Sequence, residues 1–326
     1  MNTPSLDILA IAAHRDDVEQ TCGGTLLKMA QRGRRTGILD LTQGEMGTRG
    51  SAEERAAEAG EAARILHVSW RHALDIPDGR VENTWANRLK VARVIREQRP
   101  RVVILPYWQG RHPDHYTASV LGYEACFLAG LAKLGKAAVN TQQPAFSPET
   151  GAATQDARVA TPVSRPEAPA GRLRPRGTDL PARQASRSQS QFSRMPPETS
   201  VEAHDLSRGK FEANEEAALA AVGALTPHRP FKIVYATLYY DVRPTFVVDI
   251  TEQFEVRLLS IYAYKSQFAD QAAGASDFPA HAEIRERVAI MAGFYGLLAG
   301  VKYAEPFLQK EVGLVEDLLQ IPIKSI

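Results

Sequence analysis

The feature that most constrains the fold is an alternation of short apolar runs with segments of helical period over the first third of the chain. The apolar runs, which predict strands, are Leu6–Ala13, Gly37–Leu41, Ala73–Ile76 and Val102–Tyr107. The segments between them, which predict helices, are Thr25–Gln31, Ala52–Leu66 and Asn87–Gln98, the last ended by Pro100. This succession predicts an α/β fold that is Rossmann-like, with a mostly parallel sheet and helices on both faces.

The amino-acid composition changes between about residues 141 and 210, which are rich in Pro, Gln, Ser, Thr and Arg and poor in aromatic residues. Such a composition predicts a disordered insertion. We interpret it as a solvated tether, with binding of an acidic partner by its arginines as the alternative. Regular patterns resume as strands at Phe231–Tyr240 and Thr245–Ile250 and as helices at Thr251–Tyr264 and His281–Leu298. The chain is therefore expected to be one domain, residues 1–326, interrupted by this insertion.

Net charge, hydropathy and cysteine content limit the partners and the cellular compartments to be expected for the protein. The formal charge of +1 gives no global reason to expect nucleic acid or an acidic membrane surface. No apolar run approaches the length of about 18 residues that a membrane-spanning helix needs, and the segment after Leu6 does not suit a signal peptide. Because Cys22 and Cys126 form no close pair, we expect a reducing compartment, the cytoplasm.

Ionisable residues cluster after the first and fourth apolar runs. His14, Asp16 and Asp17 follow the first run, and His112, Asp114 and His115 follow the fourth. Because ligands of an open parallel sheet bind at the carboxyl ends of its strands, these six side chains are expected to meet at one edge.

Histidine and carboxylate together form a ligand set suited to Zn²⁺ with one position left for water. His14 and Asp17 would supply two ligands, and His112 or His115 the third. We favour His115, because a residue in the first turn of a helix is held rigidly. The alternative interpretation is structural, since Asp16 or Asp17 could instead cap a helix.

Other candidates at this edge are less specific. Arg49, Arg55, Arg80 and Arg111 lie on or beside it, and their guanidinium groups could bind a substrate carboxylate or form surface ion pairs. Cys22 also lies near, but no base is placed to activate it, so we interpret it as a small buried apolar residue.

The two motifs resemble the signature of the PIG-L/LmbE-like zinc deacetylases, which have A-H-x-D-D after the first strand and H-P-D-H after the fourth. They stand here as Ala13–Asp17 and His112–His115. Further stretches resemble the branch that acts in bacillithiol biosynthesis, the N-acetylglucosaminyl-malate deacetylases: Leu41–Gly50, Ala263–Phe268 and Gly300–Phe307. The likeness spans residues 5 to 135 and about 228 to 320.

That resemblance implies one Zn²⁺ per subunit, held by His14, Asp17 and His115. It makes Asp16 the general base, His112 the group that stabilises the oxyanion, and Asp114 the residue that orients His112. Arg55 and Arg111 match positions that contact the malate carboxylates in that branch, and Arg49 is a further candidate for substrate binding. Arg15 departs from the family pattern, where proline is commonest, and no counterpart of a mobile tyrosine found in some relatives can be placed.

The implied activity is hydrolysis of the N-acetyl group of N-acetylglucosaminyl-L-malate. The alternatives are a deacetylase of another N-acetylglucosamine conjugate, such as an inositol conjugate or a chitin fragment, and a catalytically silent module that binds a metal or a partner. We also expect a homo-oligomer whose only other partner is the small amino-sugar substrate.

Overall fold

The computed structural model describes residues 5–135, 215–238, 241–268 and 281–317. By its contacts the chain divides into two units, Met1–Thr141 with Gly209–Ile326, and Gln142–Arg208. The second unit, and with it the predicted insertion, lies outside the described residues. The sheet and the helices that pack on it all belong to the first unit.

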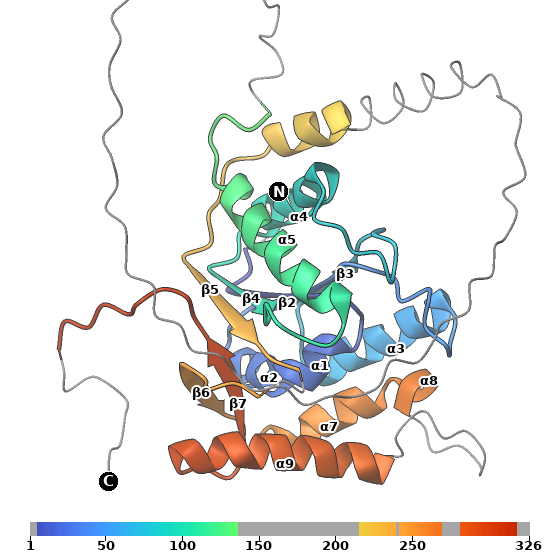
Figure 1. Cartoon of the computed structure of the whole chain (residues 1–326), viewed down its shortest axis with the longest axis vertical. Helices are drawn as coiled ribbons and strands as arrows, with labels where there is room; N and C mark the ends of the chain where they lie inside the picture. The colour runs from blue at the N-terminus through green and yellow to red at the C-terminus, as the bar shows by residue number, and fades with distance from the viewer. Residues whose placement is uncertain (1–4, 136–214, 239–240, 269–280, 318–326) are drawn as a thin grey trace, which may run out of the picture. The chain divides into compact units, whose positions relative to one another are not determined.

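The first unit is built on a seven-stranded sheet in the order β3-β2-β1-β4-β5-β7-β6 (Figure 1). The strands are β1 (Ile8–Ala12), β2 (Thr36–Asp40), β3 (Trp70–Ala73), β4 (Val102–Pro106), β5 (Lys232–Ala236), β6 (Phe246–Asp249) and β7 (Ala304–Leu308). The first five in sheet order run parallel, whereas β7 is antiparallel to both β5 and β6. The predicted α/β class and mostly parallel sheet are confirmed.

Helices cover both faces of the sheet (Figure 1). They are α1 (Asp17–Thr21), α2 (Gly23–Gln31), α3 (Ala52–Ile65), α4 (Trp85–Gln98), α5 (Pro113–Ala129), α7 (Phe254–Tyr262), α8 (Lys265–Phe268) and α9 (His281–Ala299). Alternate residues of β1 show the division: Leu9 and Ile11 pack into the core with α4 and α5, whereas Ala10 and Ala12 pack with α1 and α2. Both faces of β1 are therefore buried, as its continuous apolar run predicts.

Local sequence sets where several helices begin and end. Ser51 and Glu54 form a capping box at the start of α3, and Thr84 accepts a hydrogen bond from the backbone of Asn87 at the start of α4. Helix α4 ends at Arg99, which has a positive φ of 49° and precedes a proline. Pro113 occupies the first position of α5, where its missing N–H costs nothing.

Two strands differ from the sequence prediction for an identifiable reason. The strand predicted at Ala73–Ile76 is observed three residues earlier, as β3. Arg71 lies inside this strand and is polar in sequence, so the apolar pattern missed its beginning; in the structure ion pairs allow Arg71 to be buried there. Strand β7 was not predicted, since it contains Glu305 and Pro306; Glu305 is 1% exposed and is bonded within the core. A buried, fully bonded charge does not register as apolar in a sequence pattern.

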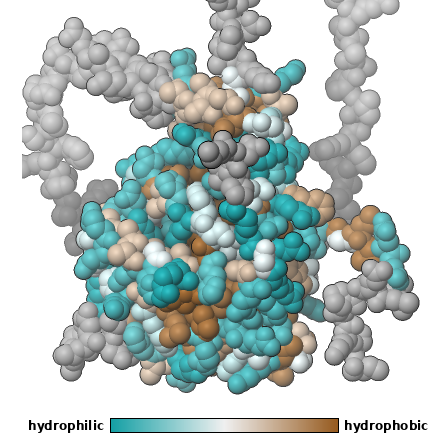
Figure 2. Space-filling view, turned by 180° about the vertical axis from the view of Figure 1, so that it is seen from behind, coloured by the Kyte–Doolittle hydropathy of each residue, from teal (hydrophilic) through white to brown (hydrophobic). Residues whose placement is uncertain are grey.

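Apolar side chains also lie on the surface. Tyr116, Val120, Tyr123 and Phe127 form one exposed stripe along α5, at helical spacing. Seen from behind, the described surface shows hydrophobic residues gathered within a largely hydrophilic face (Figure 2). Among the described residues, no helix combines the length and the apolar character needed to cross a bilayer.

Candidate metal centre

Two loops bring the motif residues together at the carboxyl edge of the sheet. Strands β1 and β4 are parallel neighbours, so the loop after Ala12 and the loop after Pro106 leave the same edge. The first loop carries His14 and leads into α1, which begins at Asp17. The second leads into α5, whose N-terminal cap is His112.

Three residues from these loops, His14, Asp17 and His115, bring their donor atoms together in a compact triangle, with Asp17 contributing both carboxylate oxygens. His14 Nδ1 lies 3.2 Å from His115 Nε2 and 3.5 Å from Asp17 Oδ2, and His115 Nε2 lies 3.2 Å from Asp17 Oδ1. Ligands about 2.0–2.1 Å from a tetrahedral Zn²⁺ are separated by about 3.3 Å. The spacing of these donors therefore fits a zinc ion, and they are the three residues expected to be ligands.

The other ring nitrogen of His14 faces two carboxylates. His14 Nε2 lies 3.1 Å from Asp78 Oδ1 and 3.3 Å from Asp114 Oδ2. Asp114 is fixed in turn by the backbone N–H groups of Gly79 and Val81, at 2.9 and 3.2 Å. This is the arrangement of a carboxylate, a histidine and a metal in which the carboxylate sets the tautomer and orientation of the ring.

Two further groupings share His14, one with His112 and His115 and one with Asp78 and Asp114. We favour the triangle with Asp17, because both of its histidine nitrogens have an Asp17 oxygen within 3.5 Å. The histidine trio consists of three neutral or positive rings, and the Asp78 and Asp114 oxygens contact the ring nitrogen opposite the triangle.

The electrostatics of the cluster also favour a cation. Burial lowers the pKa of His14, but its hydrogen bonds to Asp114, Asp17 and Asp78 outweigh this and raise that pKa to about 12. Burial opposes the charge of Asp17 as well, yet His115 and His14 hold the pKa of Asp17 well below its usual range. Without a metal, the cluster thus needs a protonated His14 to balance its carboxylates, and a divalent cation supplies that balance instead.

Asp16 lies beside the triangle and has its own partners. Its Oδ2 accepts a hydrogen bond from Gln20 Nε2 at 3.0 Å, and its Oδ1 pairs with Arg55 Nη2 at 3.3 Å. Burial raises the pKa of Asp16, and the neighbouring carboxylate of Asp17 raises it further. A carboxyl whose pKa is raised by burial and by a like charge is better suited to accept and return a proton.

Arg55 lines the cleft described below and is also bound to the protein. It is buried at 4% exposure, pairs with Asp16, and donates through Nη1 to the carbonyl of Gly44 at 2.9 Å. Gly44 has a positive φ of 74°, and a Cβ there would lie 2.2 Å from Arg55 Nη1. Glycine at this position lets the loop after β2 close over the guanidinium. Arg55 was expected to bind substrate, which stays a prediction; its contacts show that it also holds Asp16 in place.

His112 and Asp114 are related differently from the expectation. The carboxylate of Asp114 contacts His14, Gly79 and Val81, so it orients a candidate ligand rather than the ring of His112. The ring of His112 is oriented by the backbone instead: its Nδ1 accepts from the N–H of Asp114 at 3.2 Å. That bond places the ring hydrogen of neutral His112 on Nε2. Burial, together with His14 and His115, lowers the pKa of His112.

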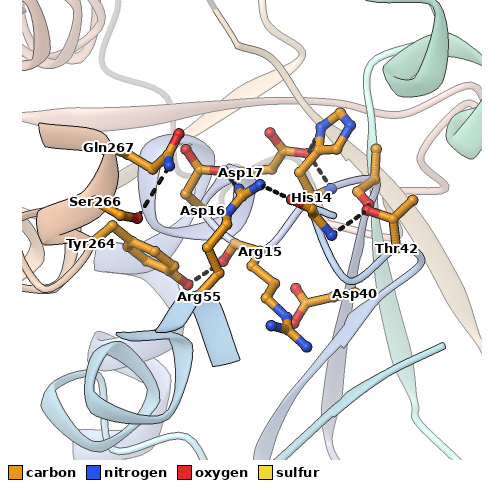
Figure 3. Close-up of polar contacts among 12 residues, drawn as sticks. His14, Arg15, Asp16, Asp17, Asp40, Thr42, Arg55, Tyr264, Ser266 and Gln267 are labelled. Carbon is orange, nitrogen blue, oxygen red and sulfur yellow. Dashed lines mark hydrogen bonds and ion pairs between the residues drawn. The ribbon is translucent and has the colours of Figure 1, made fainter. Parts of the chain in front are cut away.

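A buried network that the sequence did not reveal supports the metal loop, and Figure 3 draws one of its contacts, between Tyr264 and Arg15. The carbonyl of Arg15, between His14 and Asp16, accepts hydrogen bonds from Arg71 and from the hydroxyl of Tyr264. Arg71 also binds Asp40 through Nε and Nη2, at 2.9 and 3.0 Å, and Glu19 through Nη1 at 2.6 Å. The stretch Ala263–Phe268, noted for its resemblance, was the one signal that could have pointed to Tyr264.

A cleft of about 710 Å³ opens beside these groups. It is lined by His14, Asp16, Asp17, Gln20, Met46, Gly47, Thr48, Arg55, Asp78, Gly79, Arg111, His112, His115, Leu238 and Gln267. Arg111, which was expected to bind substrate, is exposed on its wall. Arg49, the other such candidate, approaches through its main chain, since its carbonyl accepts from Gln267 Nε2 at 2.9 Å.

Comparison with known proteins finds similar sequences and structures. Residues 9–126 match the family model described as PIG-L, GlcNAc-PI de-N-acetylase. The chain is 37% identical to diacetylchitobiose deacetylase from Thermococcus kodakarensis over 145 residues, which cover 40% of this chain and 54% of that protein. The chain thus spans about half the length of that relative.

Two further relatives are matched over more of their length. The uncharacterized deacetylase YaiS of Escherichia coli is 33% identical over 135 residues, covering 36% of this chain and 72% of that protein. The crystal structure of the conserved protein TT1542 from Thermus thermophilus is similar over 95% of this chain and 98% of its own, at 28% identity and a TM-score of 0.60.

Proposed function

Because the chain belongs to the PIG-L family, we propose that it is a zinc-dependent hydrolase that removes the acetyl group from an N-acetylglucosamine conjugate. The observation that carries the proposal is the triangle of His14 Nδ1, Asp17 and His115 Nε2, with spacings of 3.2–3.5 Å, beside the buried carboxyl of Asp16. One face of this group opens on a cleft large enough for a sugar.

His14, Asp17 and His115 would hold the ion. A zinc ion bound there acts as a Lewis acid, which polarises the acetyl carbonyl and makes a water molecule nucleophilic at neutral pH. Asp16 takes the proton of the attacking water at a carboxylate oxygen, and the carboxylate is kept in place by Arg55 at Oδ1 and by Gln20 at Oδ2. The Nε2–H of His112, fixed by the backbone bond to its Nδ1, donates to the oxyanion that forms at the carbonyl oxygen of the acetyl group.

The reaction closes with the same residues. Asp16 returns its proton to the amide nitrogen, the C–N bond breaks, and the products are acetate and a free amine. Asp114 and Asp78 act through the ring of His14, whose orientation they fix. The amide, one water and no further reactant account for all atoms of the products.

A direct test is release of free amine from diacetylchitobiose, N-acetylglucosamine and N-acetylglucosaminyl-malate, with zinc and after chelation. We expect activity that disappears with the chelator and returns with zinc. Stoichiometric zinc without hydrolysis of any of the three substrates would support the alternative, a metal-binding or partner-binding module that does not catalyse.

For the conjugate, we propose N-acetylglucosaminyl-L-malate, with the neutral chitobiose unit as the second candidate. The dicarboxylate requires cationic partners, and Arg111 supplies one on the cleft wall. Arg111→Ala should reduce kcat/KM for the malate conjugate by tenfold or more while leaving diacetylchitobiose nearly unchanged. Arg80→Ala is the matched control, since Arg80 is also exposed but pairs with Glu82. Equal losses on both substrates would exclude the malate conjugate.

We also propose a cellular location and an oligomeric state for the protein. The cytoplasm is the proposed location, because Cys22 and Cys126 are both free and buried, without a disulfide.

We propose a homo-oligomer in which the exposed apolar stripe of α5 is covered by a second copy, because such stripes mark association surfaces. Light scattering during size-exclusion chromatography tests this: Phe127→Asp should lower the oligomer mass, and a monomeric parent protein would contradict it.

A further inference from the structure

The segment just before the second metal motif, residues 108–111, is called here the entry loop. On one side of it the N–H of Tyr107 donates to the carbonyl of Ala236 at 2.8 Å, and on the other side His112 caps α5. Between these two points, within the described part of the chain, the entry loop makes no hydrogen bond. The loop ends in Arg111, which lies on the wall of the cleft. Side-chain packing must therefore hold Arg111 in position.

The ring of Trp108 supplies this packing. It is half-buried against the core, and its centroid lies 4.5 Å from that of Tyr107. It also meets the ring of Tyr235, on β5, edge to face at 4.8 Å. Aromatic pairs in such geometry stabilise by more than the area that they bury. The position of Trp108 thus sets where the rest of the entry loop, up to Arg111, begins.

A lysine that follows the last described strand lies over the same rings. Lys310, two residues beyond β7, places its Nζ 5.0 Å from the ring centroid of Trp108, 4.6 Å from that of Tyr123 and 4.9 Å from that of Tyr235. A cation within about 6 Å of an aromatic face is attracted to it. No described carboxylate forms an ion pair with Lys310, so the three rings are the partners of its charge.

From these contacts we infer that Lys310 is a positioning residue for substrate binding, which holds Trp108 in place and, through it, Arg111. The inference rests on the proposed function, in which Arg111 binds the carboxylates of the conjugate. Lys310 is not among the residues that line the cleft, so its effect reaches the substrate through the entry loop. His112 is fixed separately, by the N–H of Asp114 and by its place at the start of α5, so the chemical step is spared.

Lys310→Met tests the inference, because methionine keeps much of the length of the side chain and removes its charge. We expect KM for N-acetylglucosaminyl-malate to rise about two- to fivefold, the effect of one cation–π contact at a partly exposed site, while kcat changes less than about twofold. Lys310→Arg keeps a cation over the rings and should restore the parental KM.

Lys302→Met is the matched control. Lys302 is also exposed and lies 5.1 Å from the ring centroid of Tyr303, but neither residue lines the cleft. Its KM and kcat should be those of the parent protein. A parental KM in Lys310→Met, or an equal rise in Lys302→Met, would overturn the inference.

A double-mutant cycle shows whether Lys310 acts through Arg111. In the Arg111→Ala background, Lys310→Met should raise KM no further, because the entry loop then carries no cation to position. A rise in KM that persists without Arg111 would show that Lys310 contacts the conjugate itself or acts on the whole fold. Either result would refute the positioning role.

A measurement without substrate separates this inference from the proposed function. Acrylamide quenching of tryptophan fluorescence reports how firmly Trp108 is held, and a Trp108→Phe variant isolates its contribution from those of Trp70 and Trp85. Lys310→Met should raise the quenching constant of Trp108, and Lys302→Met should leave it unchanged. If quenching follows this pattern but no conjugate is hydrolysed, the proposed function fails and the hold of Lys310 on the loop stands. If the malate conjugate is hydrolysed and the quenching constant stays parental, the positioning role is wrong.

Discussion

Replacing Arg71 with methionine should test whether the metal loop depends on the buried network behind it. The guanidinium of Arg71 is 9% exposed and contacts Glu19, Asp40 and the carbonyls of Arg15 and Ala59. Methionine keeps much of the length of the side chain but none of its donors. The carboxylates of Glu19 and Asp40, which are 0% and 2% exposed, would then be buried without their cation.

Removing one partner of a buried ion pair typically costs about 3–5 kcal/mol of unfolding free energy. For a domain of this size each kcal/mol lowers the melting temperature by about 2–4 °C, so the expected drop is roughly 6–20 °C. A protein with a typical stability of about 5–15 kcal/mol would remain folded at low temperature. Zinc affinity should fall as well, because the Arg15 carbonyl that Arg71 holds lies between His14 and Asp17.

The assays are thermal unfolding of the metal-free protein and calorimetric titration with zinc. Arg64→Met is the matched control, since Arg64 also binds a carboxylate through two nitrogens, Glu61 at 2.7 and 2.6 Å, but on the surface. A solvated pair of this kind contributes little, so the control should melt close to the parent protein. Arg71→Met and Arg64→Met melting alike would refute the reasoning, as would an unaltered zinc affinity in Arg71→Met.

Three further outcomes are expected at the centre itself. Asp16→Asn should keep one zinc by metal analysis and lose about 10²–10⁴-fold in kcat, and an active asparagine variant would show that another group takes the proton. Asp17→Ala should lose stoichiometric zinc while its far-ultraviolet circular dichroism stays that of the parent protein; retained zinc would exclude Asp17 as a ligand. Because hydrogen bonds to carboxylates overcome burial and raise the pKa of His14 to about 12 in the metal-free protein, zinc must displace a proton at neutral pH. As the pH rises, the dissociation constant for zinc should therefore fall about tenfold per pH unit for each proton released. Calorimetric titrations in two buffers of different ionisation enthalpy should detect that release. A zinc affinity that does not depend on pH would contradict the prediction.

The sequence predicted the sheet edge and the motif residues well, because strands β1 and β4 are apolar throughout and their polar successors are close in sequence. It placed His14, Asp17 and His115 at one edge, where the structure brings their donor atoms within 3.5 Å of one another. The sequence did not predict which neighbouring residue each polar side chain would contact. For Arg55 the sequence suggested a substrate carboxylate as partner, and its pairing with Asp16 was not predicted.

The unpredicted elements share a physical cause. Arg71 and Glu305 are charged residues inside strands, and only their buried partners make those positions compatible with a sheet. Tyr264 reaches the carbonyl of Arg15 across 249 residues of sequence, a distance over which periodicity carries no information. The local sequence pattern therefore predicts where the strands end. It does not predict the long-range side-chain contacts that hold the loops after those strands in place.

The contacts between the first loop and the last third of the chain have a consequence for biosynthesis. Every proposed ligand has been synthesised by residue 115, but Tyr264 secures the Arg15 carbonyl, Arg257 binds the carbonyls of Glu19 and Gln20, and Glu305 caps the start of α2. A nascent chain therefore acquires its stiff metal loop only after Glu305 has emerged from the ribosome. Metal loading is expected to follow that point, and a fragment ending near residue 130 should capture zinc more weakly than a chain that includes Glu305.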